Sequence, residues 1–464
     1  MFNILDKVVG NANFWLELRY HSRKALSFAV ENGKLSNASN SIYTGVGVRT
    51  LVDGCWGFAS TSILSIEGIW KAVEEARIAA ERSNSMKKRK VSSLPSSGIA
   101  KGKFEPTITD DVRNHSVDEK IKLVLGAEKK AHLASKLIVS ASCRYSEMVD
   151  EKYIVNSDGA HVHVLDIKPE FRIMTVAMEN SEMQMGFASA GVTGGWGELF
   201  KHESPEDLAI HSVKIAVNKL KAEEPEGGEA TVILDPSLVG VLAHEAIGHT
   251  VEADFVLAGS IAKGKIGEKV GSKLVTLVDS GKASIGTDAA GLTLVDDEGI
   301  EAKDVIVIDK GILKSYLHNR ESAGIFNVEP TGNARAFTYS DEPIIRMRNT
   351  YIEPGTSKLD DMIMATKKGY FFKRLGGGGQ ADANAEFMFG VLEGYKIENG
   401  KITSPVKNVT ISGQAFDVLK TVDMVSDDFK WGLGAGYCGK MQPAKVDAGG
   451  PYLRCRVKIG GNQR

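Results

Sequence analysis

The sequence predicts an α+β protein, with an N-terminal domain of sheet and helices and a C-terminal domain that is mostly antiparallel and barrel- or sandwich-like. Helical and strand patterns alternate in the first half of the chain. The second half instead contains many short segments rich in Val, Ile and Thr, separated by turns that contain Gly. The acidic, Pro- and Gly-containing stretch "KAEEPEGGEA" lies between them. We therefore expect an N-terminal domain at residues 1–224 and a C-terminal domain at residues 225–464.

Three segments of the first half have the apolar spacing and the start signals of helices. The second opens with Ser116 and Glu119 in capping-box spacing, and the third places Pro205 in its first turn. One face of each segment is apolar, so each helix should pack on a sheet. We expect these helices at residues 65–82, 116–134 and 204–222.

Strands and an exposed loop complete the expected N-terminal domain. The segment "YIVNSDGAHVHVLDIKPEFRIMTVAM" has the pattern of two strands around an Asn-Ser-Asp-Gly turn, which gives a sheet covered by helices on one face. The stretch near residues 83–103 is rich in Ser and Lys and has no periodic apolar positions. We expect an exposed loop there.

Composition and charge exclude several classes of protein. The chain has 464 residues, 42% of them hydrophobic, and a formal net charge of -2. This composition is typical of a globular protein, and nucleic acid is not the expected ligand. The N-terminus does not read as a secretion signal, and no run of about 18 apolar residues occurs, so we expect a cytoplasmic protein without a membrane segment. Four widely spaced cysteines fit a reducing compartment.

The stretch "VLAHEAIGHTVEAD" is the candidate chemical motif. His244 and Glu245 follow an apolar helix start, and His249 comes five residues after the first histidine. On a regular helix this spacing separates the two imidazoles by about 140°, so they would not face one ion. A π-turn, or unwinding at Gly248, would bring them together. The alternative is a pair of hydrogen-bonded core histidines with Glu245 on an exposed face.

Two histidines do not complete a catalytic zinc site, which usually has three protein ligands and one open position. Glu252 is the nearby candidate for a further ligand, and Cys438 in "GAGYCGKMQP" is the distant one. A site closed by four protein ligands would be structural. The alternative function is therefore a noncatalytic zinc-binding regulatory or interaction protein, such as a modulator of a toxin or topoisomerase.

The sequence resembles the TldD/PmbA peptidases, and within them the TldD type. The motifs that carry the resemblance cover nearly the full length and include "DGCWGFAS", "HEAIGHTVEAD", "TGNARAF", "GGGGQADANAEFMFG" and "CGKMQP". The resemblance implies a zinc peptidase with one zinc per active site, held by His244, His249 and Cys438. Glu245 would act as general base on a zinc-bound water that attacks the peptide carbonyl. The pattern departs from the family after Lys440, where Met441 is followed directly by Gln442.

Further residues are candidates for substrate binding. The resemblance suggests that Gly378, Gly379 and Gln380 lie along the active-site cleft, where an extended peptide could add as a strand. Arg346 and Asn349 could bind substrate carbonyls or a peptide carboxylate, or Arg346 could pair with a structural Asp.

Two further expectations concern a carboxylate cluster and the partners of the chain. The carboxylates of "VDDEGI", residues 295–300, predict a turn with one of them facing the site. Substrates implied by the resemblance are small peptides or unfolded polypeptides. A PmbA-type chain in a heterodimer, or a second copy in a homodimer, is the implied partner.

Overall fold

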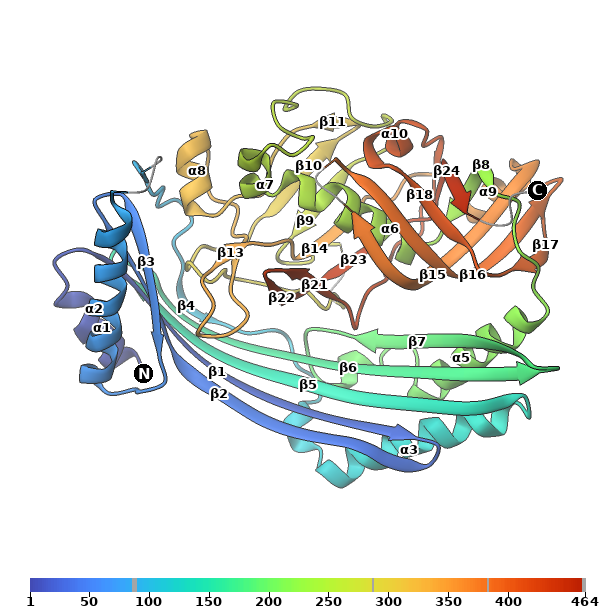
Figure 1. Cartoon of the computed structure of the whole chain (residues 1–464), viewed down its shortest axis with the longest axis horizontal. Coiled ribbons are helices and arrows are strands. Elements are labelled where there is room, and N and C mark those ends of the chain that lie inside the picture. Colours follow the sequence, from blue (N-terminus) through green and yellow to red (C-terminus); the bar gives the residue numbers. More distant parts are fainter. Residues whose placement is uncertain (86–89, 286–287, 382–383, 461–464) are drawn as a thin grey trace.

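A curved sheet of seven strands forms the N-terminal half of the protein, shown along the lower part of Figure 1. The computed structural model describes residues 1–85, 90–285, 288–381 and 384–460, with the side chains of 378–381 excluded. The strand order is β3-β2-β1-β5-β6-β4. The first residues of β6 pair with β4, and its later residues pair with β7. The strands are β1 (Trp15–Glu31), β2 (Lys34–Val52), β3 (Cys55–Thr61), β4 (Lys101–Phe104), β5 (Ile138–Asn156), β6 (His161–Glu179) and β7 (Glu182–Gly191).

Helices cover one face of this sheet, as predicted. Ser116 and Glu119 form the expected capping box at the start of α3, and Pro205 opens α5. The apolar sides of these two helices pack against β1, β5, β6 and β7, while α1 and α2 cover the other end of the sheet. The elements are α1 (Phe2–Gly10), α2 (Ile66–Ser83), η1 (Val112–Asn114), α3 (Val117–Ala134), α4 (Trp196–Leu199) and α5 (Pro205–Leu220).

The other face of the sheet is polar but also buried. On β1, Leu16 and Leu18 belong to the apolar cluster under the helices, whereas Arg19, His21 and Arg23 alternate with them on the opposite face. These three polar side chains are at most 7% exposed. They are covered because the C-terminal half of the chain packs on this face, which makes the sheet the middle layer of the molecule (Figure 1).

The C-terminal half contains the predicted barrel. Five strands close in the order β15-β8-β24-β18-β16 and back to β15, with β17 and β19 attached outside this ring. Its strands are β8 (Gly228–Leu234), β15 (Lys368–Ala381), β16 (Glu386–Glu398), β17 (Lys401–Val406), β18 (Thr410–Gln414), β19 (Met424–Val425) and β24 (Leu453–Gly460). The α+β class and the barrel are therefore confirmed.

A six-stranded sheet lies beside the barrel, in the order β11-β10-β9-β14-β23-β20. It consists of β9 (Leu277–Ser280), β10 (Asp304–Asp309), β11 (Ile312–Leu313), β14 (Asn349–Ile352), β20 (Lys430–Trp431) and β23 (Asp447–Gly450). Two small antiparallel pairs are β12 (Ala334–Arg335) with β13 (Ile344–Ile345), and β21 (Tyr437–Lys440) with β22 (Gln442–Lys445). The remaining C-terminal helices are α6 (Pro236–Val241), α7 (Ala253–Ala258), α8 (Arg320–Phe326), α9 (Leu359–Met364) and α10 (Ala415–Lys420).

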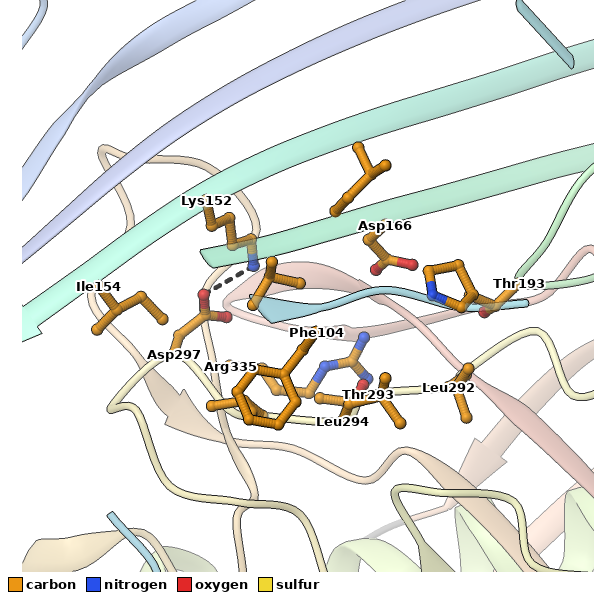
Figure 2. A pocket seen from close by; sticks show the side chains of 14 residues that line it. Phe104, Lys152, Ile154, Asp166, Thr193, Leu292, Thr293, Leu294, Asp297 and Arg335 are labelled. Atoms are coloured by element: carbon orange, nitrogen blue, oxygen red, sulfur yellow. Dashed lines mark hydrogen bonds and ion pairs between the residues drawn. The ribbon is translucent and has the colours of Figure 1, made fainter. Parts of the chain in front are cut away.

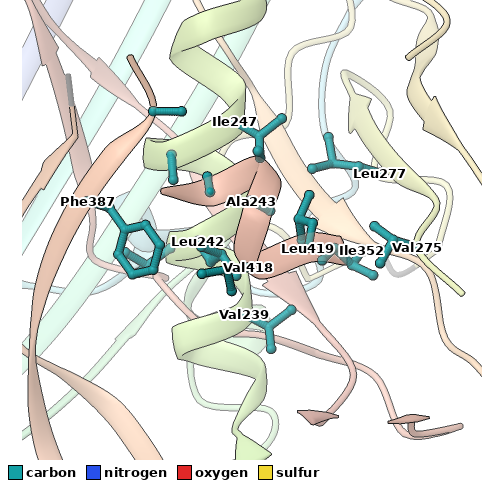
Figure 3. Close-up of a cluster of buried hydrophobic side chains, with 14 of the residues drawn as sticks. Val239, Leu242, Ala243, Ile247, Val275, Leu277, Ile352, Phe387, Val418 and Leu419 are labelled. Atoms are coloured by element: carbon teal, nitrogen blue, oxygen red, sulfur yellow. The ribbon is translucent and has the colours of Figure 1, made fainter. Parts of the chain in front are cut away.

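The segment that carries the histidine motif is buried between these two sheets. Its apolar residues, among them Val239, Leu242 and Ile247, belong to the largest hydrophobic cluster, together with Leu277 and Phe387 (Figure 3). Burial of this cluster on both sides fixes the rotation of the helix about its axis. The polar side chains of the motif are therefore held in a fixed direction relative to the two sheets.

Two expectations need comment. The predicted loop near residues 83–103 is shorter than expected, because Lys101–Phe104 forms β4 and pairs in parallel with β6, while residues 86–89 lie outside the described part. In the described ranges, the helices are all too short or too polar to cross a membrane. The division at residues 224 and 225 stays a prediction.

Candidate metal centre

The histidine motif sits on a helix that changes its geometry along its length. Asp235 caps the start of α6 by accepting a hydrogen bond from the backbone N–H of Leu238 at 3.0 Å. The helix then widens into a π-helical turn, η2 (Leu242–Gly248), and continues into a short 3₁₀ turn, η3 (His249–Val251). The imidazole centroids of His244 and His249 are 5.5 Å apart. The expected distortion is confirmed, and it places both rings on one side.

Gly248 gives this turn the space it needs. A Cβ atom there would lie 1.9 Å from Sδ of Met347 and 3.3 Å from the carbonyl oxygen of Ala243. Gly240, about two turns earlier, is similarly confined, because a Cβ would lie 2.5 Å from the backbone of Ala448. Both glycines therefore allow the helix to approach its neighbours closely.

Cys438 joins the two histidines from a distant part of the chain. It lies on β21, which forms a hairpin with β22, and its Sγ is 3.1 Å from Nε2 of His249. Ligand atoms of His244, His249 and Cys438 all lie within 4.8 Å of one another. Nε2 of His244 is buried and has no hydrogen-bond partner among the described residues. Two imidazoles and a thiol are a donor set suited to zinc, and the orphaned nitrogen is available for a metal.

Electrostatics inside the cluster favour the thiolate. Burial raises the pKa of Cys438, but the charges of the two nearby histidines, His244 first, and the contact with His249 more than offset it, to give a pKa of about 4. Burial lowers the pKa of His249, whereas Glu252 and Cys438 raise it well above its ordinary value. A thiolate is the form of cysteine that binds metals. The cluster therefore holds a deprotonated sulfur beside two nitrogens.

Two carboxylates flank His249 in different positions. Glu245 is 29% exposed, and its Oε2 lies 3.7 Å from Nε2 of His249, the nitrogen that faces Cys438. Glu252 is fully buried, and its Oε2 lies 2.8 Å from Nδ1, the other ring nitrogen. Glu245 therefore lies on the same side of the His249 ring as Cys438, whereas Glu252 lies on the opposite side.

The predicted substrate residues Arg346 and Asn349 have partners within the protein. Arg346 is buried and donates to the carbonyl oxygen of Cys438 at 2.7 Å and to that of Gln442. Asn349 donates to the carbonyl oxygen of Ser280 at 2.8 Å. Arg346 thus holds the backbone of the hairpin that carries the cysteine, and its binding of substrate stays a prediction.

Two other groups of candidates lie elsewhere. Gly378, Gly379 and Gln380 fall outside the residues whose side chains are described, although their backbone belongs to β15. Gln442 accepts from the N–H of Phe337 at 2.7 Å and donates to the carbonyl oxygen of Glu342, so it anchors the tip of the hairpin.

The carboxylates of "VDDEGI" form the expected turn: Asp296 accepts hydrogen bonds from backbone N–H groups, including that of Ile300 at 2.9 Å, and the other two carboxylates pair with cations of the N-terminal sheet. Asp297 pairs with Lys152 at 2.7 Å beside a cavity of about 40 Å³ (Figure 2), and Glu298 pairs with Arg49 at 2.6 Å. The first pair is partly buried and the second is buried, and both tie the two halves of the chain together. Within the described part of the chain, the group of possible metal ligands contains neither carboxylate.

Sequence reasoning missed two residues around the centre. Lys440 is buried, and its Nζ lies 3.1 Å from Oε2 of Glu252. Thr350 on β14 lies 3.5 Å from Nδ1 of His244 and donates to Asp279 at 3.1 Å. For Lys440 a signal existed, because it follows Cys438 by two residues on a strand and so shares its face.

A cavity of about 1020 Å³ opens between the polar face of the N-terminal sheet and the barrel. Its walls include Arg172 and Phe187 on one side and residues 434–436, which directly precede Tyr437 and Cys438, on another. Beyond Phe187 the same sheet face carries four methionines that are 40–62% exposed. They are Met174, Met178, Met183 and Met185.

Comparison with known proteins gives one family. Sequence models described as "PmbA/TldA metallopeptidase domain 1", "central domain" and "C-terminal domain" match residues 16–80, 110–220 and 227–461. A metalloprotease of Methanocaldococcus jannaschii is 35% identical, over 95% of this chain and 95% of its own length. A protein of Saccharolobus solfataricus named zinc metalloprotease TldD homolog is 29% identical, over 99% of this chain and 100% of its own.

Solved structures share the fold. A Thermotoga maritima protein described as a modulator of a DNA gyrase superposes with a TM-score of 0.81 at 22% identity, covering 99% of each chain. TldE from Thermococcus kodakarensis superposes with a TM-score of 0.78 at 19% identity, covering 99% of this chain and 100% of its own. At these identities the likeness concerns the fold alone.

Proposed function

The chain belongs to the PmbA/TldD family of metallopeptidases, and we propose that it is a zinc-dependent peptidase that hydrolyses small peptides or unfolded polypeptides. The observation that carries the proposal is the convergence of His244, His249 and Cys438 on one point, with Nε2 of His244 left without a partner in the described structure. These three residues would hold one zinc ion. When bound, zinc supplies a Lewis acid that activates water and polarises a peptide carbonyl.

The protein's own residues supply the remaining chemistry. Glu245 is partly exposed beside the cluster, so its carboxylate can accept a proton from water and pass it to the leaving amine. Arg346 keeps the carbonyl of Cys438 fixed, which orients the sulfur toward the histidines. We assign Glu245 as general base and the three ligands as the metal centre.

The large cavity supports a peptide as substrate. A volume of about 1020 Å³ exceeds what a single amino acid needs, and its wall continues directly into the hairpin of Cys438. The methionines that extend this face are flexible and adapt to side chains of different shape. A polypeptide without folded structure can follow such a groove, whereas a folded domain cannot.

The alternative, a noncatalytic zinc-binding regulatory protein, depends on Glu252 as a fourth ligand that closes the site. Its carboxylate contacts Nδ1 of His249, while Cys438 lies at Nε2 of the same ring. A zinc ion at Nε2 would then have three protein ligands rather than four, which favours a catalytic over a structural site. Membership of the PmbA/TldD family supports a PmbA-type chain as the partner in a heterodimer, and a homodimer is the second arrangement. We place the protein in the cytoplasm.

Bound metal is the first measurement, because it can be made on this chain alone, without a partner chain. Wild type, Cys438→Ala and Cys455→Ala are purified without chelators, and zinc per chain is measured by mass spectrometry. Cys455 is the matched control, since it is equally buried but lies on β24 in the barrel core. We expect about one zinc in wild type and in Cys455→Ala, and a sharp loss in Cys438→Ala.

Catalysis is then tested with Glu245→Gln. This variant should keep its zinc and lose about 100-fold or more in peptide hydrolysis, since it cannot accept a proton. Absence of zinc from reconstituted wild type would refute the metal centre. Full hydrolysis by Glu245→Gln would refute the assignment of the base.

A further inference from the structure

We infer that Glu252 and Lys440 are positioning residues that fix the ring of His249 so that Nε2 faces Cys438. The inference rests on the proposed zinc centre and extends it by two residues, neither of which is a metal ligand. It starts from two contacts that join the same two segments of the chain. One is Cys438 with His249 at 3.1 Å, and the other is Lys440 with Glu252, also at 3.1 Å.

The spacing on each segment explains why both contacts form together. Cys438 and Lys440 are two residues apart on β21, so their side chains project from the same face of the strand. Both are buried, whereas Gly439 between them is exposed. His249 and Glu252 are three residues apart and in direct contact, with Oε2 of Glu252 lying 2.8 Å from Nδ1 of His249. The strand β21 therefore contacts the histidine motif at two points, through Cys438 and through Lys440.

The charges make this arrangement specific. Glu252 has no exposed surface, and a buried carboxylate is stable only when it is paired or hydrogen-bonded. Lys440 provides the charge, and its ammonium also contacts Asp254 at 2.6 Å and the carbonyl oxygen of Ile345 at 3.0 Å. It lies 4.3 Å from the ring centre of Phe255 as well. Because these partners hold Lys440 from several sides, the carboxylate of Glu252 is held in turn.

The consequence for His249 is a defined tautomer. A carboxylate at Nδ1 keeps a ring proton there, so Nε2, which faces Cys438, is the nitrogen that would give its lone pair to a metal. A metal-binding histidine needs this arrangement, since its ligating nitrogen must be free of hydrogen. Glu252 faces the opposite side of the ring and is absent from the ligand group found among the described residues. Its role is to orient the ligand.

A buried ion pair elsewhere in the protein offers a matched control. Glu147 on β5 and Lys120 on α3 are both at most 7% exposed, and the carboxylate of Glu147 accepts from Nζ of Lys120 at 2.8 Å. This pair joins a helix to the N-terminal sheet, on the face opposite the cysteine hairpin. Glu147→Gln therefore removes the same buried charge without touching the histidine or the hairpin, whereas Glu252→Gln removes the acceptor at Nδ1.

The experiment titrates the full-length, metal-free protein with Co²⁺ and follows the ligand-field and sulfur-to-cobalt absorption bands. We expect Glu252→Gln to weaken Co²⁺ binding about 10- to 100-fold with unchanged band positions, because its ligand set is the same. Glu147→Gln should change the affinity less than threefold. Should Glu252→Gln not fold, the double variant Glu252→Gln/Lys440→Met, which removes both buried charges, takes its place.

Three outcomes would overturn the inference. Equal affinity in wild type and Glu252→Gln would show that the carboxylate does not orient His249. Shifted bands in Glu252→Gln would mean that Glu252 is itself a ligand. Absence of cobalt binding in wild type would overturn the zinc centre as well, and this result is distinct from the first two.

Discussion

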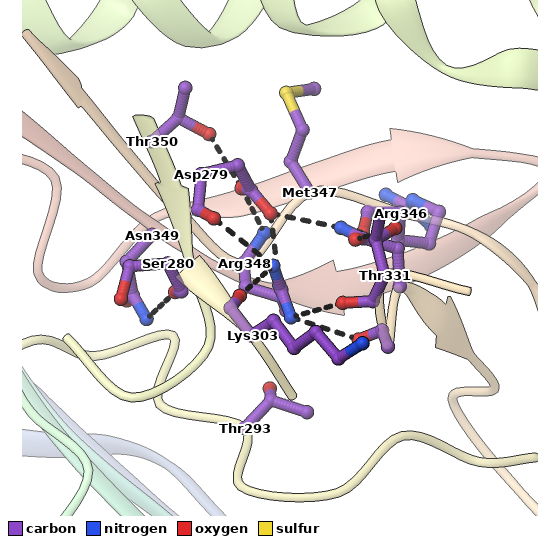
Figure 4. A network of polar contacts seen from close by, with 12 residues as sticks. Asp279, Ser280, Thr293, Lys303, Thr331, Arg346, Met347, Arg348, Asn349 and Thr350 are labelled. Atoms are coloured by element: carbon purple, nitrogen blue, oxygen red, sulfur yellow. Dashed lines mark hydrogen bonds and ion pairs between the residues drawn. The ribbon is translucent and has the colours of Figure 1, made fainter. Parts of the chain in front are cut away.

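Arg348→Met should be among the most damaging single substitutions outside the metal ligands. The side chain of Arg348 has no exposed surface and lies in a polar network beside the motif helix (Figure 4). Its Nε donates to Asp279 at 2.9 Å, and its two terminal nitrogens donate to backbone carbonyls, including that of Lys303 at 2.8 Å. Asp279 is equally buried. Methionine would fill much of the space but leave this carboxylate without its counter-charge.

The expected loss follows from that burial. Removing one partner of a buried ion pair destabilises a protein by about 3–5 kcal/mol, because the remaining charge stays desolvated. Arg454→Met is the control, since Arg454 also makes two contacts with one carboxylate, at 2.8 and 2.9 Å, but its partner Asp423 is 56% exposed. For such a pair the expected loss is about 0–1 kcal/mol. Replacing Arg by Met should therefore cost much more stability at position 348 than at position 454.

The assay is urea denaturation of each full-length variant, followed by circular dichroism at neutral pH. The metal centre provides a second measurement, because Thr350 donates to Asp279 and lies 3.5 Å from Nδ1 of His244. Arg348→Met should therefore also weaken Co²⁺ binding, whereas Arg454→Met should not. If the two variants lost equal stability, the argument from burial would be wrong.

Three further predictions concern the motif helix and the groove. Burial raises the pKa of Asp235 to about 6, so folding favours its protonated form, and stability is lost as pH rises from about 4 through 6. Asp235→Asn should remove this loss, which is worth up to about 3 kcal/mol. In thermal melts, the stability of the variant relative to wild type should therefore increase between pH 4 and pH 7. Gly248→Ala should destabilise the protein by about 1–3 kcal/mol and weaken metal binding, because its Cβ would overlap Met347. The double variant Gly248→Ala/Met347→Ala should recover part of the metal affinity in a Co²⁺ titration. Met174→Asp should raise KM for peptides with apolar side chains while zinc content stays at the wild-type level, and an unchanged KM would exclude this face from the groove.

The parts of the fold that sequence reasoning predicted are those with local signals. Ser116 with Glu119 and Pro205 mark helix starts within a few residues, and the five-residue histidine spacing requires a wider turn if both rings are to meet. These inferences need only the chain's own periodicity. The resemblance to a family then joined Cys438 to the histidines, which local patterns left open.

The long strands β1 and β2 were not predicted, for a physical reason. A strand with one buried and one solvent-exposed face shows apolar and polar residues in alternation. The polar face of β1 carries Arg19, His21 and Arg23. These residues look like a solvent-exposed face, yet they are buried against a segment more than 300 residues away. Arg19 donates to the carbonyl oxygen of Thr338, and Arg23 lies 3.9 Å from the ring centre of Phe337. Only the tertiary contact reveals this role.

The same contact explains how the N-terminal half takes part in a site whose ligands are all C-terminal. The hydroxyl of Tyr437, next to Cys438, donates to Glu170 on β6 at 3.2 Å, and Arg172 on that strand donates to the carbonyl oxygen of Ala435. Gly191 completes the contact, because a Cβ there would lie 2.4 Å from the backbone of Gly434. The cysteine hairpin is thus held by the histidine motif on one side and by the N-terminal sheet on the other. A metal ligand with one neighbour could swing away from the histidines, whereas one held from both sides stays in place, so the chemistry of the C-terminal half depends on the sheet of the N-terminal half.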